Sequence, residues 1–463
     1  MKKKATNFNR RVAKAVAQFA EYTNEINAFI KRSVENNQLE INEDAIPEIL
    51  NGQTTLTLQR VVPIHIRKEA GIFFTSSALA EKVADHLAPI LQTGVKLCDP
   101  ACGAGNLLVA CARHLPIGSS LKETLKIWST LIFGYDLHSE FVRATQLRLT
   151  LLAGTRHPNE IQYLTKIEPP NVFKLIKVGD VFAQIQMQKD SCVVVNPPFG
   201  HMPSPDDCKW ASGKIQIAAW FLEKILQNSH KGQHIVAILP DVLRSGSRYQ
   251  KWRDITASLC SFILVEPAGR FDESTDVDVF ILHVILGTPK TIAPQWLPVQ
   301  LQTIGAGHTV ADFFDVHTGS VVPHRDPLKG LNYPYIHART APAWQTIERL
   351  SEQRQHAGRV FTPPFVVVHR TSSPSDKDRC VATIVNEKLD VAVENHLLVL
   401  LPKAKSLDSC KQLLEILKLP ETNNWFNQRI RCRHLTVASV RELPCHDIGG
   451  IYINTKQEIK KWR

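Results

Sequence analysis

The sequence lacks the features that mark membrane, secreted and common zinc-binding proteins. Its apolar runs, such as Ile217–Leu222, are far shorter than the roughly 18 residues of a membrane-spanning helix, so we expect no membrane partner. No apolar stretch follows the basic residues of Met1–Thr6, so we expect no secretory signal. None of the 10 cysteines form a C-x2-C pair, so we expect no metal site. A cytoplasmic protein with reduced thiols is the simplest expectation.

Low-complexity tracts, internal repeats and a strong compositional bias are also absent. Hydrophobic residues make up 44% of the chain and charged residues 21%, which are ordinary values for a globular protein. They exclude a disordered chain, a collagen-like chain and a coiled coil. The length of 463 residues exceeds that of one ordinary domain, so two or three domains are expected.

Positive charge is in excess and is unevenly distributed. The chain has 55 Lys and Arg residues against 44 Asp and Glu residues, a formal net charge of +11. Residues 71–350 hold 26 basic and 24 acidic residues, whereas residues 351–463 hold 18 and 12. The excess favours a polyanionic partner near the C-terminal quarter, and a solvated basic surface without a partner is the alternative.

The pattern of apolar residues changes twice along the chain. Spacings of three and four residues predict an amphipathic helix or helix pair over residues 5–37, which we expect to pack on the main domain. From about residue 71, strand-like and helix-like stretches alternate, which predicts a mostly parallel α/β sheet with helices on both faces. Strands are predicted at residues 95–98, 131–135, 173–178, 192–195, 234–239, 262–266 and 276–286, and helices at residues 78–92, 106–114, 139–152, 215–228 and 249–259.

The alternation stops after about residue 290. Prolines, short strands and one helix at residues 406–418 follow, which predicts a separate α+β domain. We therefore expect an N-terminal helical segment over residues 1–65, an α/β domain over residues 66–290 and a C-terminal domain over residues 291–463.

The strongest chemical signal is the end of the first predicted strand. The strand ends at Asp99-Pro100 and enters a turn that contains Gly103 and Gly105. Glycine lets the backbone adopt unusual dihedral angles and lets a ligand approach closely, and ligands bind at the carboxyl ends of strands in open α/β sheets. An ordinary tight strand-to-helix turn is the alternative. A P-loop and the dinucleotide fingerprint are both excluded, because the Lys-Ser/Thr pair and the third glycine are missing.

Three later strands also end in polar residues. Asp136 follows Phe133-Gly-Tyr, where a carboxylate can accept hydrogen bonds from ribose hydroxyls or cap the next helix. Asp180 follows Val178-Gly and is uninformative alone. Asn196 ends Val193-Val-Val and is followed by Pro-Pro-Phe-Gly, which displays acceptors beside an aromatic ring, since proline donates no N–H group. A rigid turn with a hydrophobic plug is the alternative for Asn196.

Together, in this order and spacing, the four strand ends resemble the N6-adenine DNA methyltransferases of restriction–modification systems. Asp99–Gly105 matches the family's Asp-Pro-x-Cys-Gly-x-Gly motif, and Asn196–Phe199 its Asn-Pro-Pro-Tyr/Phe motif. Ala70–Ser77 looks like the Gly-x-Phe-Thr-Pro segment, with Ser76 in place of the usual proline, and Gly232–Leu243 looks like a later core strand. The resemblance covers about residues 66–290, and its motif order is that of the gamma group.

The resemblance implies a Rossmann-like methyltransferase fold that binds S-adenosyl-L-methionine. Asp136 would hold the cofactor ribose and Asp180 its adenine, while Val181 stands where the family often has phenylalanine. Asn196 and the Pro197 carbonyl would accept from the target amino group, and Phe199 would stack on the extruded base. The catalytic set is then Asn196, Pro197, Pro198 and Phe199, and the cofactor set is Thr75, Asp99, Pro100, Ala101, Gly103, Gly105, Asp136, Asp180 and Val181.

The C-terminal domain is similar, more loosely, to the target-recognition domains of stand-alone gamma enzymes. Arginine reads guanine with two hydrogen bonds, and lysine and arginine contact phosphates. Salt bridges or solvation are the alternative roles for the basic residues. The candidates for contacts with double-stranded DNA are Arg370, Lys377, Arg379, Arg429, Arg431 and Arg433.

The sequence therefore predicts a site-specific DNA adenine N6-methyltransferase that flips its target base, the modification enzyme of a restriction–modification or related defence system. A separate restriction endonuclease or defence-system subunit is a conceivable partner. Two alternatives stay open. One is methylation of RNA or of a protein glutamine amide, and the other is a non-catalytic DNA-binding subunit of a defence complex.

Overall fold

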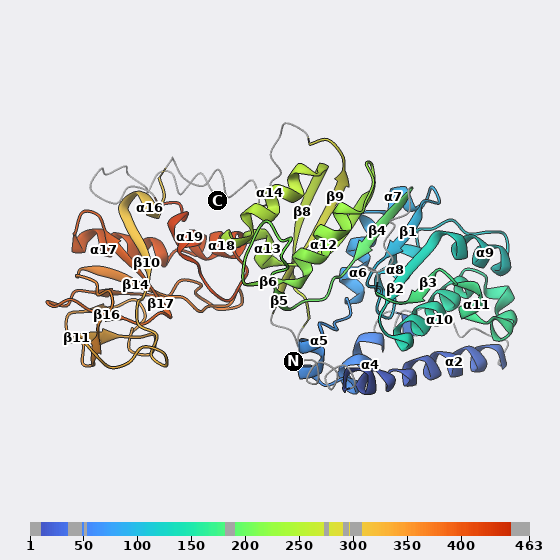
Figure 1. The fold of residues 1–463 in the computed structure, drawn as a ribbon, viewed down its shortest axis with the longest axis horizontal. Coiled ribbons are helices and arrows are strands. Elements are labelled where there is room, and N and C mark those ends of the chain that lie inside the picture. Colours follow the sequence, from blue (N-terminus) through green and yellow to red (C-terminus); the bar gives the residue numbers. More distant parts are fainter. Residues whose placement is uncertain are drawn as a thin grey trace. The chain divides into compact units, whose positions relative to one another are not determined.

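The computed structural model describes residues 11–35, 49–50, 53–180, 190–272, 277–289, 296 and 308–445. The chain divides into two units, residues 1–296 and 297–463, and each unit has its own hydrophobic core (Figure 1). The predicted boundaries at residues 65 and 290 stay predictions. Among the described residues, no helix is both long enough and apolar enough to cross a bilayer.

A seven-stranded sheet forms the centre of the first unit, in the order β3-β2-β1-β4-β7-β9-β8. The first five strands of this order run parallel, and β9 pairs antiparallel with β7 and β8. The mostly parallel α/β fold is thereby confirmed. The strands are β1 (Lys96–Asp99), β2 (Ile132–Asp136), β3 (Ile176–Val178), β4 (Ser191–Val195), β7 (His234–Pro240), β8 (Cys260–Arg270) and β9 (Asp278–Leu286).

Burial explains why the central strands are apolar throughout while the edge strand alternates. Every residue of β4 is buried, because parallel strands with neighbours on both sides are covered on both faces. The edge strand β8 alternates partly buried and exposed residues along Ser261–Val265 instead. Asp276, predicted to begin the last strand, lies outside the described residues.

Helices pack against this sheet, α10 on β2 and β3, α8 on β1 and β4, and α12 on β7 (Figure 1). A short hairpin, β5 (His201–Pro203) with β6 (Lys214–Gln216), follows the Asn-Pro-Pro-Phe segment. The helices are α6 (Ser77–Asp85), α7 (Ala88–Leu91), α8 (Asn106–Ala112), α9 (Leu121–Leu131), α10 (Ser139–Thr155), η2 (Pro158–Lys166), α11 (Pro169–Val172), α12 (Ile217–Gln227), α13 (Asp241–Ser245), η4 (Ser247–Tyr249) and α14 (Gln250–Ser258).

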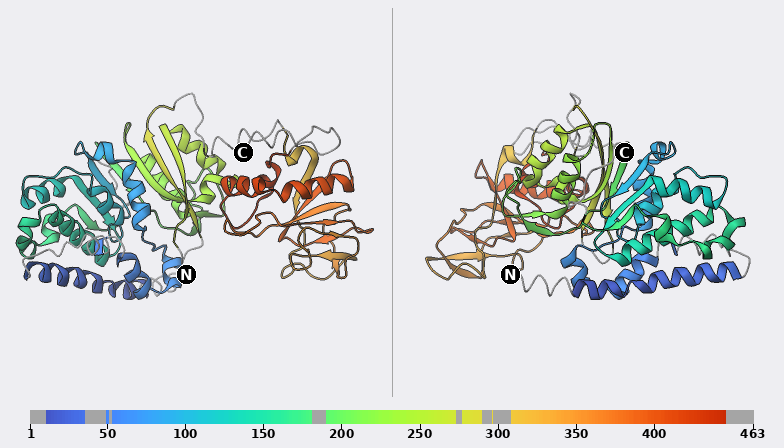
Figure 2. Two further views of the ribbon diagram at one scale, coloured as in Figure 1. Left: turned by 180° about the vertical axis from the view of Figure 1, so that it is seen from behind. Right: turned by 45° about the vertical axis from the view of Figure 1, so that its right-hand side comes forward.

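The N-terminal helices share the core of the first unit. The helix α2 (Ala20–Glu35) lies along α10, and α4 (Gln53–Val61) and α5 (Ile64–Ala70) follow it (Figure 2). The apolar residues at the predicted three- and four-residue spacing face the core: Val12, Val16, Phe19, Ile26 and Ile30 are buried, and Phe29 and Val34 are partly buried. The expectation that this segment packs on the main domain is confirmed for the described residues. The two ends of the predicted range, residues 5–10 and 36–37, lie outside them.

The second unit contains a five-stranded sheet, β10-β17-β14-β15-β12, and a three-stranded sheet, β13-β11-β16. Alternate residues of β14 face two different apolar clusters, Val366 and Val368 one of them and Phe365 and Val367 the other. The α+β arrangement is as predicted. Its elements are α16 (Val310–Phe313), β10 (Phe314–Thr318), β11 (Leu331–Ile336), β12 (Thr346–Ile347), β13 (Gln353–His356), β14 (Phe365–His369), β15 (Ala382–Val385), β16 (Ala392–Val393), β17 (Leu397–Pro402), α17 (Leu407–Leu417), α18 (Pro420–Arg429) and α19 (Val437–Arg441).

Candidate active site

The polar strand ends meet at one edge of the parallel sheet. Asp99 is the last residue of β1, Asp136 is the last residue of β2, and Asn196 directly follows β4. Because β1 pairs in parallel with both β2 and β4, the three residues lie at the carboxyl ends of adjacent strands. In this kind of sheet that edge is where ligands bind.

The loop Asp99–Gly105 is held by carboxylates and closely packed side chains. The Asp99 Oδ1 atom accepts a hydrogen bond from the Ala101 N–H group at 3.0 Å, and Asp136 Oδ2 accepts one from the Gly103 N–H group at 3.1 Å. Gly105 has a φ of 84°, and a Cβ atom there would lie 2.7 Å from Thr145 Cγ2. Only glycine fits this position, because the Thr145 side chain packs directly against the backbone there.

The two acidic residues of this edge differ in their surroundings. Asp99 is 1% exposed, and burial raises its pKa to about 8 although the Ala101 N–H group opposes the shift. Burial also raises the pKa of Asp136, while the His138 and Gly103 N–H groups lower it. Asp136 is only partly buried, and both of its oxygens accept backbone hydrogen bonds. Asp99 therefore shapes the loop, whereas Asp136 is the carboxylate that a ligand can reach.

The amide of Asn196 is oriented by the segment that precedes α6. Its Nδ2 atom donates to the Phe73 carbonyl at 3.2 Å and to Thr75 Oγ1 at 3.1 Å. Its Oδ1 atom is buried and has no hydrogen-bond partner in the described part of the chain. A buried acceptor without a donor is costly, so it marks a place where a ligand supplies the missing N–H group.

An aromatic wall stands next to this amide. Phe199 is 8% exposed, and its ring meets that of Phe271 edge to face with centroids 5.3 Å apart. The Phe73 and Phe271 centroids are 6.4 Å apart. Sequence reasoning missed Phe271, because it follows β8 in a segment without a recognisable motif. Pro198 packs tightly against Gly71, whose added Cβ atom would lie 2.9 Å from the Pro198 Cβ atom.

The remaining predicted cofactor residues are less completely described. Thr75 is 2% exposed and contacts Asn196, as above. Asp180 lies two residues beyond β3, at the same edge of the sheet. Val181 lies outside the described residues. A role for Asp180 in holding the cofactor adenine stays a prediction.

Two of the predicted DNA-contacting arginines are buried inside the second unit. Arg379 is 0% exposed, and its guanidinium donates to the carbonyls of Ser372 at 2.6 Å and Ile430 at 2.9 Å. Arg429 is 8% exposed and pairs with Glu442 at 2.6 Å. Both residues hold the unit together, so we no longer propose Arg379 or Arg429 as DNA contacts.

The other basic candidates gather near the end of β14. The Arg370 N–H group donates to the His396 carbonyl at 2.9 Å, and Thr371 pairs with His434. Burial lowers the pKa of His434, and the nearby charges of Arg370, His396 and Arg433 lower it further. Arg370 and Arg433, which both lie near His434, provide positive charge at this place that can attract phosphate, while Glu394 lies 3.3 Å from His396. Lys377 and Arg433 are exposed, and Arg431 is partly buried.

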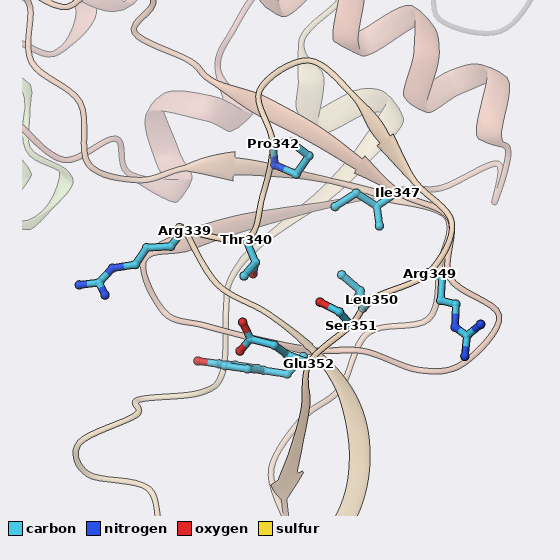
Figure 3. A pocket seen from close by; sticks show the side chains of 9 residues that line it. Arg339, Thr340, Pro342, Ile347, Arg349, Leu350, Ser351 and Glu352 are labelled. Carbon is cyan, nitrogen blue, oxygen red and sulfur yellow. The ribbon is translucent and has the colours of Figure 1, made fainter.

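A shallow pocket of about 300 Å³ lies elsewhere in the second unit (Figure 3). Arg339 and Arg349 are exposed at its rim and point away from its centre. The Tyr335 N–H group donates to the Glu352 carbonyl at 2.9 Å, so these two lining residues are neighbours. The pocket is lined by Tyr335, Arg339, Thr340, Pro342, Ile347, Arg349, Leu350, Ser351 and Glu352.

Comparison with known proteins identifies the first unit. Residues 61–286 match the family described as N-6 DNA Methylase. The chain is 22% identical over 244 residues to the modification methylase CviBIII of Paramecium bursaria Chlorella virus NC1A, a match that covers 51% of this chain and 56% of that protein. The chain thus spans little more than half the length of this curated relative.

One solved structure agrees in fold. The type IIL restriction–modification enzyme MmeI, solved in complex with DNA, superposes with a TM-score of 0.53 at 14% identity, over 85% of this chain and 70% of that chain. The type IIG restriction endonuclease BpuSI gives a TM-score of 0.42 at 14% identity, over 89% of this chain and 63% of that chain.

The residues of the site fit the cofactor that this fold implies. Asp136, at the carboxyl end of β2, offers a partly exposed carboxylate beside the glycine turn and accepts a hydrogen bond from the Gly103 N–H group. The resemblance stated from the sequence is confirmed for this part of the chain. Residues 61–286 match the N-6 DNA methylase family, and the cofactor of this domain is S-adenosylmethionine.

Proposed function

We propose that the protein is a site-specific DNA adenine N6-methyltransferase, the modification enzyme of a restriction–modification or related defence system. The observation that carries the proposal is the Asn196 amide, whose Nδ2 atom is held by Phe73 and Thr75 while its Oδ1 atom is left without a donor. An exocyclic amine is the kind of ligand that satisfies such an acceptor.

The chemistry of adenine explains why an amide is suitable. The N6 lone pair is delocalised into the ring, so the amine is a poor nucleophile. Two acceptors on its hydrogens, Asn196 Oδ1 and the Pro197 carbonyl, favour a localised lone pair. Bound S-adenosylmethionine supplies an electrophilic methyl group. Since an amide oxygen is a weak base, Asn196 acts by hydrogen bonding and positioning rather than by removing a proton before attack.

The aromatic wall suits a base that has left the duplex. Flipping a nucleotide out of the stack costs a few kcal/mol. Stacking on Phe199 returns roughly 1–3 kcal/mol of that cost. Phe271 meets the Phe199 ring edge to face and supports the same surface.

In the proposal the remaining residues bind cofactor and DNA. Thr75, Asp99–Gly105, Asp136 and Asp180 hold the cofactor, with Asp136 on its ribose hydroxyls. The second unit binds double-stranded DNA through its basic surface. The protein acts in the cytoplasm. The proposed DNA contacts are Arg370, Lys377, Arg431 and Arg433, with Arg339 and Arg349 added on account of their exposure.

Methylation-aware sequencing of genomic DNA incubated with the protein and S-adenosylmethionine tests the proposal. N6-methyladenine is expected at one position of one sequence motif and at no other adenines. Methyl transfer to RNA or to a protein amide, with none to DNA, would replace the DNA substrate by the alternative. Absence of cofactor binding would support a non-catalytic DNA-binding subunit instead.

A further inference from the structure

We propose that Arg148 is a positioning residue for two parts of the site. Through Asn106 and Thr75 it fixes the Asn196 amide, and it also fixes the loop Asp99–Gly105, here called the cofactor loop. The inference rests on the proposed function for its catalytic consequence. Arg148 lies in the middle of α10, which the sequence marked only as a helix.

Arg148 is a buried cation without a carboxylate partner in the described part of the chain. It is 0% exposed, and its Nη1 atom donates to the Ala104 carbonyl and to Asn106 Oδ1, the latter at 2.6 Å. Its Nε and Nη2 atoms are buried and unpartnered. Removing such a charge from water is expensive, and an apolar side chain of similar size is often more stable in its place. Stability therefore does not explain why an arginine stands here.

Asn106 connects Arg148 to the segment before α6 through hydrogen bonds. Because a guanidinium can only donate, Arg148 fixes the Asn106 amide with its Oδ1 atom toward α10. Thr54 Oγ1 donates to the same oxygen at 3.2 Å. The Asn106 Nδ2 atom consequently points the other way and donates to the Thr75 carbonyl at 2.5 Å.

Thr75 completes the connection to the active site. Its backbone carbonyl is held by Asn106, and its Oγ1 atom accepts from Asn196 Nδ2 at 3.1 Å. An amide whose nitrogen is held on one side must turn its oxygen to the other. The relay Arg148–Asn106–Thr75–Asn196 thus determines which atom of Asn196 faces the site.

The same helix holds the cofactor loop directly. Thr145, one turn before Arg148, donates its hydroxyl to the Gly103 carbonyl at 2.9 Å, and Arg148 donates to the Ala104 carbonyl. Two consecutive carbonyls of the glycine turn are therefore tied to α10. Cofactor loop and catalytic amide share one anchor, so a change at Arg148 disturbs both.

Two variants test the relay, Arg148→Met and Asn106→Asp. Arg148→Met removes both donors but leaves a side chain that fits an apolar interior. Asn106→Asp places a carboxylate beside Arg148, which favours folding, and replaces the donor to the Thr75 carbonyl by an acceptor. Both variants are expected to keep their melting temperature and to lose single-turnover methyl transfer at saturating cofactor and DNA by on the order of 10- to 100-fold.

Arg253→Met is the matched control. Arg253 is 5% exposed and donates to the carbonyls of Leu243 and Gly246, so it is equally buried but outside the relay. Its variant is expected to change stability and to leave the transfer rate unaltered. A wild-type rate in Asn106→Asp, or an equal loss of rate in Arg253→Met, would overturn the proposal.

Measurements without substrate separate the relay from the proposed function. In the cofactor-free protein, hydrogen–deuterium exchange of Ile72–Ser76 is expected to be faster in both relay variants than in the wild type, and cofactor affinity weaker in Arg148→Met. These results are expected even if wild-type protein methylates no DNA, which would refute the function alone. Unchanged exchange in both variants would refute the relay.

Discussion

An amide carries both a donor and an acceptor, and in Asn196 the surroundings decide which of them is left for a ligand. Phe73 and Thr75 take the donor, and the acceptor stays buried and unpaired. Since an unpaired buried acceptor is unfavourable in the free protein, part of the energy of binding an amine comes from removing that penalty. Binding and orientation of the target amine are thus the same event.

Replacing Asn196 by alanine is expected to abolish methyl transfer while leaving cofactor affinity largely intact. The substitution removes the acceptor but leaves Gly103, Gly105 and Asp136 in place. Single-turnover assays should show a loss of at least about 100-fold, the scale of losing one preorganised hydrogen-bonding group. Equilibrium titration with S-adenosylmethionine serves as the control. Normal methylation by the variant would show that the catalytic assignment is wrong.

For individual residues, the sequence predicted which polar residues lie at strand ends. It did not predict the directions in which side chains point. Asp99, Asp136 and Asn196 could be placed because adjacent parallel strands end at the same edge. Phe271 could not, since nothing in its local sequence reveals that its ring meets Phe199. Arg379 was predicted to contact DNA because a charged side chain is expected to be exposed. In the structure, backbone carbonyls accept hydrogen bonds from its guanidinium, and these acceptors make its burial possible.

Among the elements, the N-terminal helix α2 and the turn before it contribute most to the interior near the cofactor loop. Phe19 packs edge to face on Phe74 and Phe141, with centroids 5.5 and 5.1 Å away. Phe74 in turn lies so close to the loop that a Cβ atom on Gly103 would come within 3.0 Å of its ring. The Phe19 ring from the N-terminal segment therefore supports Phe74, and Phe74 contacts the glycine turn.

Truncating Phe19 to alanine is expected to destabilise the first unit by about 3–5 kcal/mol, the usual cost of removing a buried phenylalanine. Urea unfolding measures the loss, and cofactor affinity should fall as Phe74 gains freedom. Leu56→Ala, on α4, is the control, because Leu56 is 56% exposed and its removal should change stability by less than about 0.5 kcal/mol. Equal effects of the two variants would contradict the role assigned to Phe19.

The seven strands of the large sheet were predictable from periodicity, and some of the exceptions elsewhere have physical causes. The helix α9 was missed although Ser120 caps it and Leu121, Leu125 and Trp128 form its buried face. The eleven residues of α9 end at Leu131, and β2 begins at the next residue. The helical and the strand periodicity therefore adjoin in the sequence without a break. The reversed direction of β9 was not predicted, because an apolar run reads the same in either orientation.

For the whole molecule, the net charge of +11 acquires meaning from where the cations lie. The sequence located the excess in residues 351–463 but counted every arginine alike. Burial separates these arginines into two groups. Arg379 and Arg429 are buried inside the second unit, whereas Arg370 and Arg433 lie near His396 and His434 at the end of β14. Two arginines that lie close together suit an anionic partner.

The double variant Arg370→Gln/Arg433→Gln is expected to weaken DNA binding about equally for all sequences if both residues contact phosphates. Each lost phosphate contact should reduce the slope of log affinity against log salt concentration by about 1. If Arg370 reads a base instead, discrimination at one position should relax by roughly 1–3 kcal/mol. Fluorescence anisotropy at several salt concentrations distinguishes the two outcomes.

The control double variant, Arg441→Gln/Lys388→Gln, removes the same charge from two other exposed positions of the second unit. General attraction between a cationic protein and DNA would weaken both double variants alike. A local contact surface at the end of β14 would weaken only the first, since charges beyond about 8–10 Å are screened at ordinary ionic strength. Identical salt slopes for both variants would move the DNA contacts away from Arg370 and Arg433.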